Sequence, residues 1–191
     1  MSGSGLVIVQ GRSCAGCTLC CKIMAVPEYN KPRNQWCGKC DIGRGCKIYA
    51  DRPQSCRDFR CIYLLDASFA EHWKPSRSHM VLTRYQAKRL CVQVDPDYPN
   101  AWRQEPFYSD LKAWSRLAAH YGTIVAVYVG DDLTIVLPDR DEALGRVGTD
   151  KQMRLVRRSR SQALEYDVEL LDRQSAPVAE KSTGPSGGSR R

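Results

Sequence analysis

The sequence lacks long apolar runs and the short motifs of common enzyme families. Nowhere in its 191 residues do about 18 apolar residues follow one another, so we expect no membrane-spanning segment. The segment from Met1 to Gln10 has no basic start and an apolar run only over residues 6–9, so we expect no secretory signal. P-loop, GxSxG, HExxH and dinucleotide-type glycine motifs are also missing. These absences argue against a membrane protein and indicate a cytoplasmic location.

Histidine is scarce as well. The chain has three histidines, His72, His79 and His120, and none lies close in sequence to the main group of cysteines. A zinc site that mixes cysteine with histidine is therefore not expected. We interpret each histidine as a packing or surface residue rather than a ligand or base. Cys91, in a segment typical of a strand, is interpreted as a core residue. No catalytic residue is predicted.

Cysteine, in contrast, is abundant and concentrated in one part of the chain. Nine of the ten cysteines are Cys14, Cys17, Cys20, Cys21, Cys37, Cys40, Cys46, Cys56 and Cys61. Packing does not explain this density, because a buried cysteine behaves only as a small hydrophobe. In a reducing cytoplasm the pattern indicates metal binding rather than disulfides, and an odd number of thiols cannot pair completely. Redox-active thiols are the alternative.

The spacing of the cysteines favours more than one metal ion. CxxC pairs clamp a tetrahedral metal because both sulfurs can reach the ion, at about 2.3 Å for zinc. Three such pairs occur, Cys14 with Cys17, Cys17 with Cys20, and Cys37 with Cys40. The adjacent side chains of Cys20 and Cys21 diverge, so both bind only if they face different ions or share a multinuclear cluster. All nine cysteines are therefore candidate metal ligands.

Two stretches of this pattern resemble a known family. The opening CxxCxxCC covers residues 14–21, and C-x-I-Y-x-x-R-P-x-x-C-R-x-F-x-C covers residues 46–61. Together they resemble the YkgJ-type cysteine-cluster proteins, which are described as zinc- or iron-chelating. The resemblance implies a metal cluster built on about eight cysteines and implies no reaction. It places seven cysteines on cluster positions and leaves open whether Cys37, Cys40 or both complete the set.

The identity of the metal is only partly indicated. Closed sites made of sulfur suit zinc and also iron–sulfur centres, and zinc is the interpretation we favour. The run CxxCxxC also begins ferredoxin motifs, but their later cysteine followed by proline is absent, because Cys21 comes at once. Iron, as a mononuclear site or an iron–sulfur cluster, stays open.

The positive charge of the chain has two interpretations. The formal net charge is +8, and residues 14–61 contain nine Lys or Arg against four Asp or Glu. Basic groups around thiolates stabilise a negatively charged metal–sulfur centre. Arg52 and Arg57 are placed either to donate to the sulfurs or to cap backbone carbonyls. We favour this local compensation over a nucleic-acid surface. An unknown protein partner is left open.

The predicted fold is α+β. Residues 10–75 form a small irregular module stapled by metal, residues 76–150 an α+β region packed with it, and residues 151–191 a basic segment and disordered tail. We expect a helix in residues 62–73 and a helix over residues 109–121 that begins at an N-cap Ser109. Hairpins are expected over residues 80–94 and 123–137, in an antiparallel sheet. Residues 151–160 are helical or extended.

These observations lead to three functional hypotheses. The first is a protein that chelates zinc or iron through its cysteines, with more than one ion. The second is an iron or iron–sulfur oxidoreductase, and the third is a zinc module that binds nucleic acid. The sequence does not decide whether any reaction is catalysed.

Overall fold

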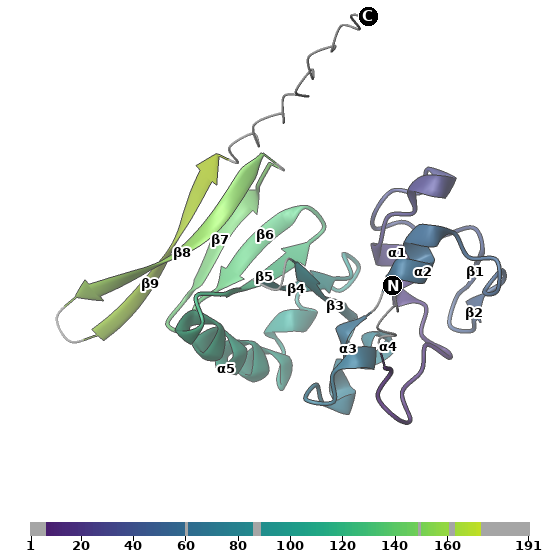
Figure 1. Cartoon of the computed structure of the whole chain (residues 1–191), viewed down its shortest axis with the longest axis horizontal. Coiled ribbons are helices and arrows are strands. Elements are labelled where there is room, and N and C mark those ends of the chain that lie inside the picture. The colour runs from purple at the N-terminus through teal and green to yellow at the C-terminus, as the bar shows by residue number, and fades with distance from the viewer. Residues whose placement is uncertain (1–6, 60, 86–88, 149, 161–162, 173–191) are drawn as a thin grey trace, which may run out of the picture.

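The computed structural model describes residues 7–59, 61–85, 89–148, 150–160 and 163–172. The cysteine-rich module lies at one end of the molecule and the last hairpin at the other (Figure 1). The tail expected from Ser175 onward lies outside the described residues. Within the described ranges no helix combines the length and apolar character needed to cross a bilayer.

Short elements make up the cysteine-rich part of the chain. They are α1 (Leu19–Ile23), η1 (Pro27–Tyr29), β1 (Cys40–Asp41), β2 (Gly45–Cys46), α2 (Gln54–Asp58), α3 (Ile62–Leu65), η2 (Glu71–Trp73) and α4 (Pro75–Ser78). The helix expected over residues 62–73 is divided into α3 and η2. Between them the Asp66 carboxylate accepts hydrogen bonds from the Ser68 backbone N–H at 3.0 Å and from its hydroxyl at 2.6 Å. This Asx turn competes with the helical hydrogen-bond pattern and ends α3.

A five-stranded sheet forms the centre of the molecule. Its strands are β3 (Met80–Tyr85), β4 (Arg89–Val94), β5 (Ile124–Val129), β6 (Asp132–Val136) and β7 (Asp141–Arg146), in that spatial order. Both predicted hairpins form, as the antiparallel pairs β3–β4 and β5–β6. The two hairpins join through a parallel pair, β4–β5, so the sheet is mixed. The prediction of an α+β fold is confirmed.

The crossover that makes β4 and β5 parallel contains η3 (Ala101–Arg103) and α5 (Phe107–His120). The predicted helix is therefore present, but it begins at Phe107, and Ser109 lies in its first turn rather than at the N-cap. Pro106 occupies the cap position. A proline suits a helix start because the first N–H groups have no partner within the helix.

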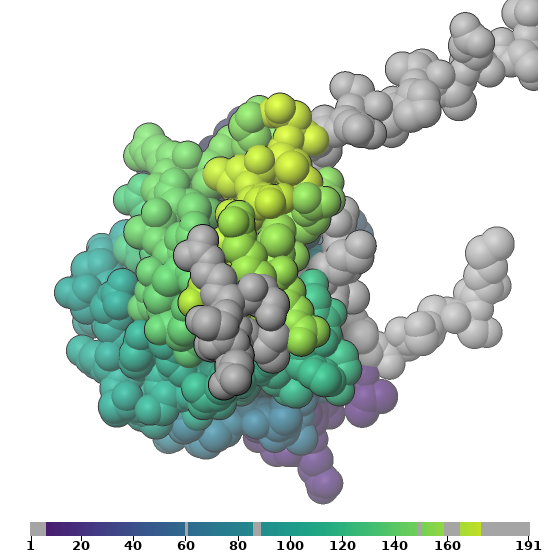
Figure 2. All heavy atoms as spheres, turned by 90° about the vertical axis from the view of Figure 1, so that its left-hand side faces the viewer, coloured from purple at the N-terminus to yellow at the C-terminus, as the bar shows by residue number. Residues whose placement is uncertain are grey.

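The last described elements are β8 (Lys151–Arg160) and β9 (Ala163–Asp172), an antiparallel hairpin. The basic segment of residues 151–160 is thus extended, and the pattern of the sequence did not indicate its partner strand. Figure 2 shows this hairpin spread across one side of the molecule. Met153, Leu155 and Tyr166 pack against a cluster of buried residues that includes Ile124 and Leu133.

The cysteine module and the sheet share one hydrophobic core. Leu19 and Ile23 of α1 belong to the same buried cluster as Trp73, Met80 and Leu82. The side chains of Ile23 and Trp73 have no solvent exposure. Burying such side chains contributes about 1.5–3 kcal/mol each, so this cluster anchors the module on the sheet.

Candidate metal centre

All nine cysteines of the predicted cluster line two adjoining cavities. The larger cavity has a volume of about 540 Å³, and its wall contains Cys14, Cys17, Cys20, Cys21, Cys37, Cys40, Cys46 and Cys56. The smaller, of about 200 Å³, is lined by Cys61 together with Cys14, Cys17, Cys20 and Cys56. The fold therefore brings together thiols that lie up to 47 positions apart in the chain (61 − 14 = 47).

Two of the predicted CxxC pairs form tight turns. The backbone N–H of Cys17 donates to the carbonyl of Cys14 at 3.0 Å, and the N–H of Cys40 donates to the carbonyl of Cys37 at 2.9 Å. Gly16, inside the first turn, has a φ of +68°, a conformation that glycine adopts without steric cost. Each turn holds its two thiols on the same short stretch of chain.

The helix α1 links the first turn to the β1–β2 hairpin. The N–H of Cys37 donates to the carbonyl of Cys21 at 3.0 Å, and the N–H of Gly43 donates to the Thr18 hydroxyl at 3.0 Å. Within the hairpin, Cys40 lies opposite Cys46. These contacts gather four thiols, those of Cys21, Cys37, Cys40 and Cys46, around the larger cavity.

Cys56 and Cys61 reach the cluster from the other side. Cys56 lies on α2, where the carboxylate of Glu28 accepts hydrogen bonds from the backbone N–H of Ser55 at 2.9 Å and from its hydroxyl at 2.7 Å. Cys61 precedes α3 and is 8% exposed. Its sulfur accepts hydrogen bonds from the backbone N–H groups of Tyr63 and Leu82. Cys61 is thus attached to the edge of the sheet.

The thiols lie close enough to influence one another's ionisation. A hydrogen bond with Cys20, together with burial, raises the pKa of Cys21 well above its ordinary value. Burial and the neighbouring Cys21 raise the pKa of Cys40 to about 12. Burial, with Cys17 and Cys14 nearby, raises the pKa of Cys61 to about 11. Clustered thiolates oppose each other electrostatically, and a bound cation is what relieves this repulsion.

A buried lysine that sequence reasoning missed accompanies the thiols. Lys31 is 8% exposed, and its ammonium donates hydrogen bonds to the carbonyl of Lys22 at 2.9 Å and to the carbonyl of Met24. Burial lowers the pKa of Lys31, and nearby cysteines, Cys37 first among them, oppose this shift. In the described part of the chain no carboxylate lies within 4.0 Å of this ammonium to form an ion pair. No sequence motif marks this lysine, because its burial depends on tertiary contacts.

The remaining walls of the cavities carry basic, apolar and hydroxyl side chains. Lys39, Arg44 and Arg52 line the larger cavity, and no Asp, Glu or His among the described residues lines either cavity. Arg52 Nε donates to the carbonyl of Tyr49 at 3.0 Å, and Arg57 Nε donates to the carbonyl of Arg52 at 2.7 Å. Of the two roles considered for these arginines, the capping of carbonyls is observed.

The donor set fits thiophilic metals, although the thiols do not converge on one point. No three His, Cys, Asp or Glu side chains of the described residues are arranged as they would be around an ion. No disulfide involves any cysteine from Cys17 to Cys91 in the described chain. Sulfur ligands with nearby cationic groups suit zinc and iron, whereas calcium and magnesium require oxygen ligands.

His72, His79 and the tenth cysteine contact neighbouring groups of the fold, whereas His120 is exposed at the end of α5. His72 Nε2 is 2.7 Å from the Asp110 carboxylate, and the ring of His79 stacks on Tyr98 with centroids 3.6 Å apart. Cys91, on β4, is 5% exposed. These residues do not line the two cysteine cavities.

No family model, curated protein or solved structure matches this chain. The resemblance to the YkgJ-type proteins therefore rests on the residues between Cys14 and Cys61 alone.

Proposed function

We propose that this protein chelates zinc or iron through a cluster of cysteine thiolates that holds more than one ion. The observation that carries the proposal is the gathering of nine thiols around two cavities that share four of them. Four thiolates saturate one tetrahedral ion, so nine exceed the needs of a single site. The adjacent thiols Cys20 and Cys21 both line the larger cavity, as expected if neighbouring ions share the cluster.

The surroundings support a thiolate centre. Lys31 is buried, and Lys39, Arg44 and Arg52 line the larger cavity, so positive charge is available to balance the negative charge of the thiolates. A bound zinc would supply a cross-link that stabilises this loop-rich module, and a bound iron would supply a one-electron centre. Because the thiols do not converge in the described structure, binding has to draw them inward, so metal affinity is coupled to local folding.

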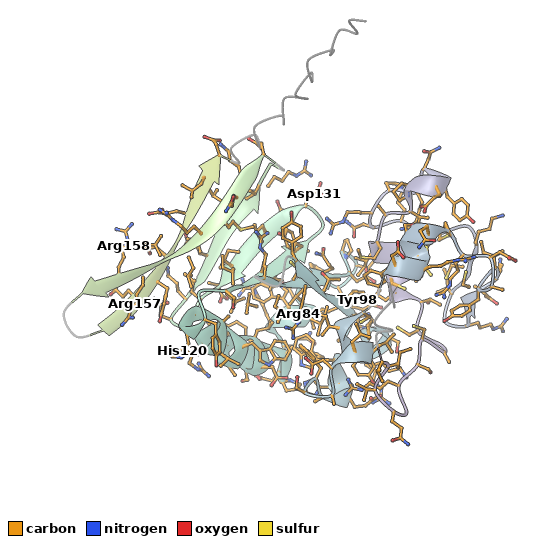
Figure 3. The ribbon with its side chains drawn as sticks, in the orientation of Figure 1. Arg84, Tyr98, His120, Asp131, Arg157 and Arg158 are labelled. Carbon is orange, nitrogen blue, oxygen red and sulfur yellow. The ribbon has the colours of Figure 1, made fainter. Side chains whose placement is uncertain are left out.

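The nucleic-acid hypothesis gains no comparable support. Arg157 and Arg158 project from β8 at the end of the molecule far from the cysteine module (Figure 3). Arg158 Nε lies 2.5 Å from the carboxylate of Asp167, and Arg154 Nη2 lies 2.6 Å from the carboxylate of Glu169. Basic side chains paired with acids in this way offer little net charge to a phosphate backbone.

The test is elemental analysis of protein purified without oxygen, with a visible spectrum of the same sample. We expect about two or more metal ions per chain; a colourless sample indicates zinc, and visible absorption indicates iron. The control is Cys91→Ala, which removes the buried thiol outside the cluster and is expected to keep the metal content, whereas Cys37→Ser with Cys40→Ser is expected to lower it. A folded, metal-free protein whose nine cluster thiols all react freely would overturn the proposal.

A further inference from the structure

The two cavities of the cluster differ in how firmly their walls are held. One side of the smaller cavity is formed by Tyr63, Leu64 and Val81, which are 3%, 5% and 0% exposed and belong to the shared core, while Ile8 and Tyr49 form part of its exposed side. Cys61 is part of the same buried cluster, and backbone N–H groups of α3 and β3 point at its sulfur. Moving this thiol requires disruption of the hydrophobic core.

The larger cavity has a less firmly held wall. Its distinctive thiols are Cys21, Cys37, Cys40 and Cys46, of which the last three lie in or beside the β1–β2 hairpin. No residue from 37 to 48, a fully described stretch, belongs to the buried core clusters. Ile42 at the hairpin turn is 59% exposed. Hydrogen bonds join this segment to α1 and its N-cap, from the N–H of Cys37 to the carbonyl of Cys21 and from the N–H of Gly43 to the Thr18 hydroxyl. A segment with few buried apolar contacts opens locally at a free-energy cost well below that of global unfolding.

Four thiols form the boundary between the cavities. Cys14, Cys17, Cys20 and Cys56 line both of them, so they can serve a metal on either side. This shared wall distinguishes the arrangement from two independent zinc ribbons, in which each ion has its own ligands.

Building on the proposed function, we propose that the cluster comprises two unequal metal sites. The inner site, at Cys61, holds a structural metal that cross-links the module to the sheet. The outer site, at Cys21, Cys37, Cys40 and Cys46, holds a metal that exchanges with external thiols or chelators while the protein stays folded. The chain would then retain one ion and release another.

The test is a chelator challenge of the full, zinc-loaded chain, followed with a chromophoric chelator. We expect two phases of zinc release, the slow one at least ~10-fold slower than the fast one, because the inner site opens only with the core. Cys46→Ser is expected to abolish the fast phase and to preserve the slow one. The control, Cys91→Ser, is expected to preserve both.

A second measurement on the unmutated chain does not depend on the folding of any variant. Alkylation after the fast phase, read by mass spectrometry, is expected to label Cys37, Cys40 and Cys46 before Cys61. A single release phase with simultaneous alkylation of these cysteines would overturn the division into two sites and leave the proposed chelation intact. Failure of the chain to bind zinc or iron at all would instead overturn the proposed function and this inference with it.

Discussion

A buried ion pair between the cysteine module and the sheet leads to a quantitative prediction. The ammonium of Lys22 on α1 lies 2.5 Å from the Asp95 carboxylate, which follows β4, and 2.5 Å from that of Asp97. The side chains of Lys22 and Asp95 are 6% and 5% exposed, whereas that of Asp97 is 70% exposed. The two carboxylates therefore contribute unequally to holding α1 in place.

Asp95→Asn is expected to lower the free energy of unfolding by about 3 kcal/mol, the lower end of the cost of leaving a buried charge without its partner. The lower end applies because Asp97 still contacts the ammonium. Asp97→Asn, the matched control, is expected to cost at most about 1 kcal/mol, as for other exposed ion pairs.

The measurement is urea unfolding of the full chain, followed by circular dichroism, with the same metal content in every variant. With a urea dependence of about 1–3 kcal/mol per molar, the Asp95 variant should unfold at a midpoint lower by about 1–3 M. In a double-mutant cycle with Lys22→Met, the coupling energy should reach about 1–3 kcal/mol. Equal losses for Asp95→Asn and Asp97→Asn, or a coupling energy near zero, would refute the reasoning.

Two further predictions concern other polar contacts. Lys31→Met leaves the buried carbonyl of Lys22 and the partly buried carbonyl of Met24 without their donor, so the free energy of unfolding should fall by about 1–3 kcal/mol. Lys39→Met, at an exposed position, should change it by less than about 0.5 kcal/mol in the same urea assay, and equal effects would contradict a stabilising role for these hydrogen bonds of Lys31. The hydroxyl of Ser68 lowers the pKa of Asp66 below 3.8, so Ser68→Ala should move that pKa upward in an NMR titration, with Ser76→Ala as a control that leaves it unchanged. A depressed carboxyl pKa contributes stability that is present above pH 3.8 and is lost as the pH falls through the lowered pKa, so the wild type should have the larger free energy of unfolding above pH 3.8 and the difference should vanish at more acidic pH. A pKa of Asp66 that does not move would refute this role.

Much of the secondary structure could be predicted because its signals are local. The β-branched runs around residues 80–94 and 123–137 predict hairpins, and both form. The helix of residues 107–120 was predicted from its apolar spacing, although its start was placed at Ser109. The break between α3 and η2 was missed, because the hydrogen bonds from Ser68 to Asp66 outweigh a weak helical pattern.

The candidate site also has features that the sequence predicted and features that it did not. The concentration of nine cysteines between Cys14 and Cys61 identifies them as one set, and CxxC spacing limits where five of their sulfurs can go because the loops between them are short. The buried lysine beside them was not foreseen, because no spacing rule connects Lys31 with the carbonyls it binds, those of Lys22 on α1 and of Met24 just after it. The division of the set between a core-attached thiol, Cys61, and a surface hairpin likewise depends on long-range packing.

The sequence by itself determined which residues belong to the cysteine cluster, the two hairpins and the long helix, since composition and period act over a few neighbouring residues. Only the tertiary structure decided the parallel pairing of β4 with β5, the shared core of module and sheet, and the grouping of thiols around two cavities. These features join segments far apart in the chain, and the burial that stabilises them exists only once the whole chain has folded.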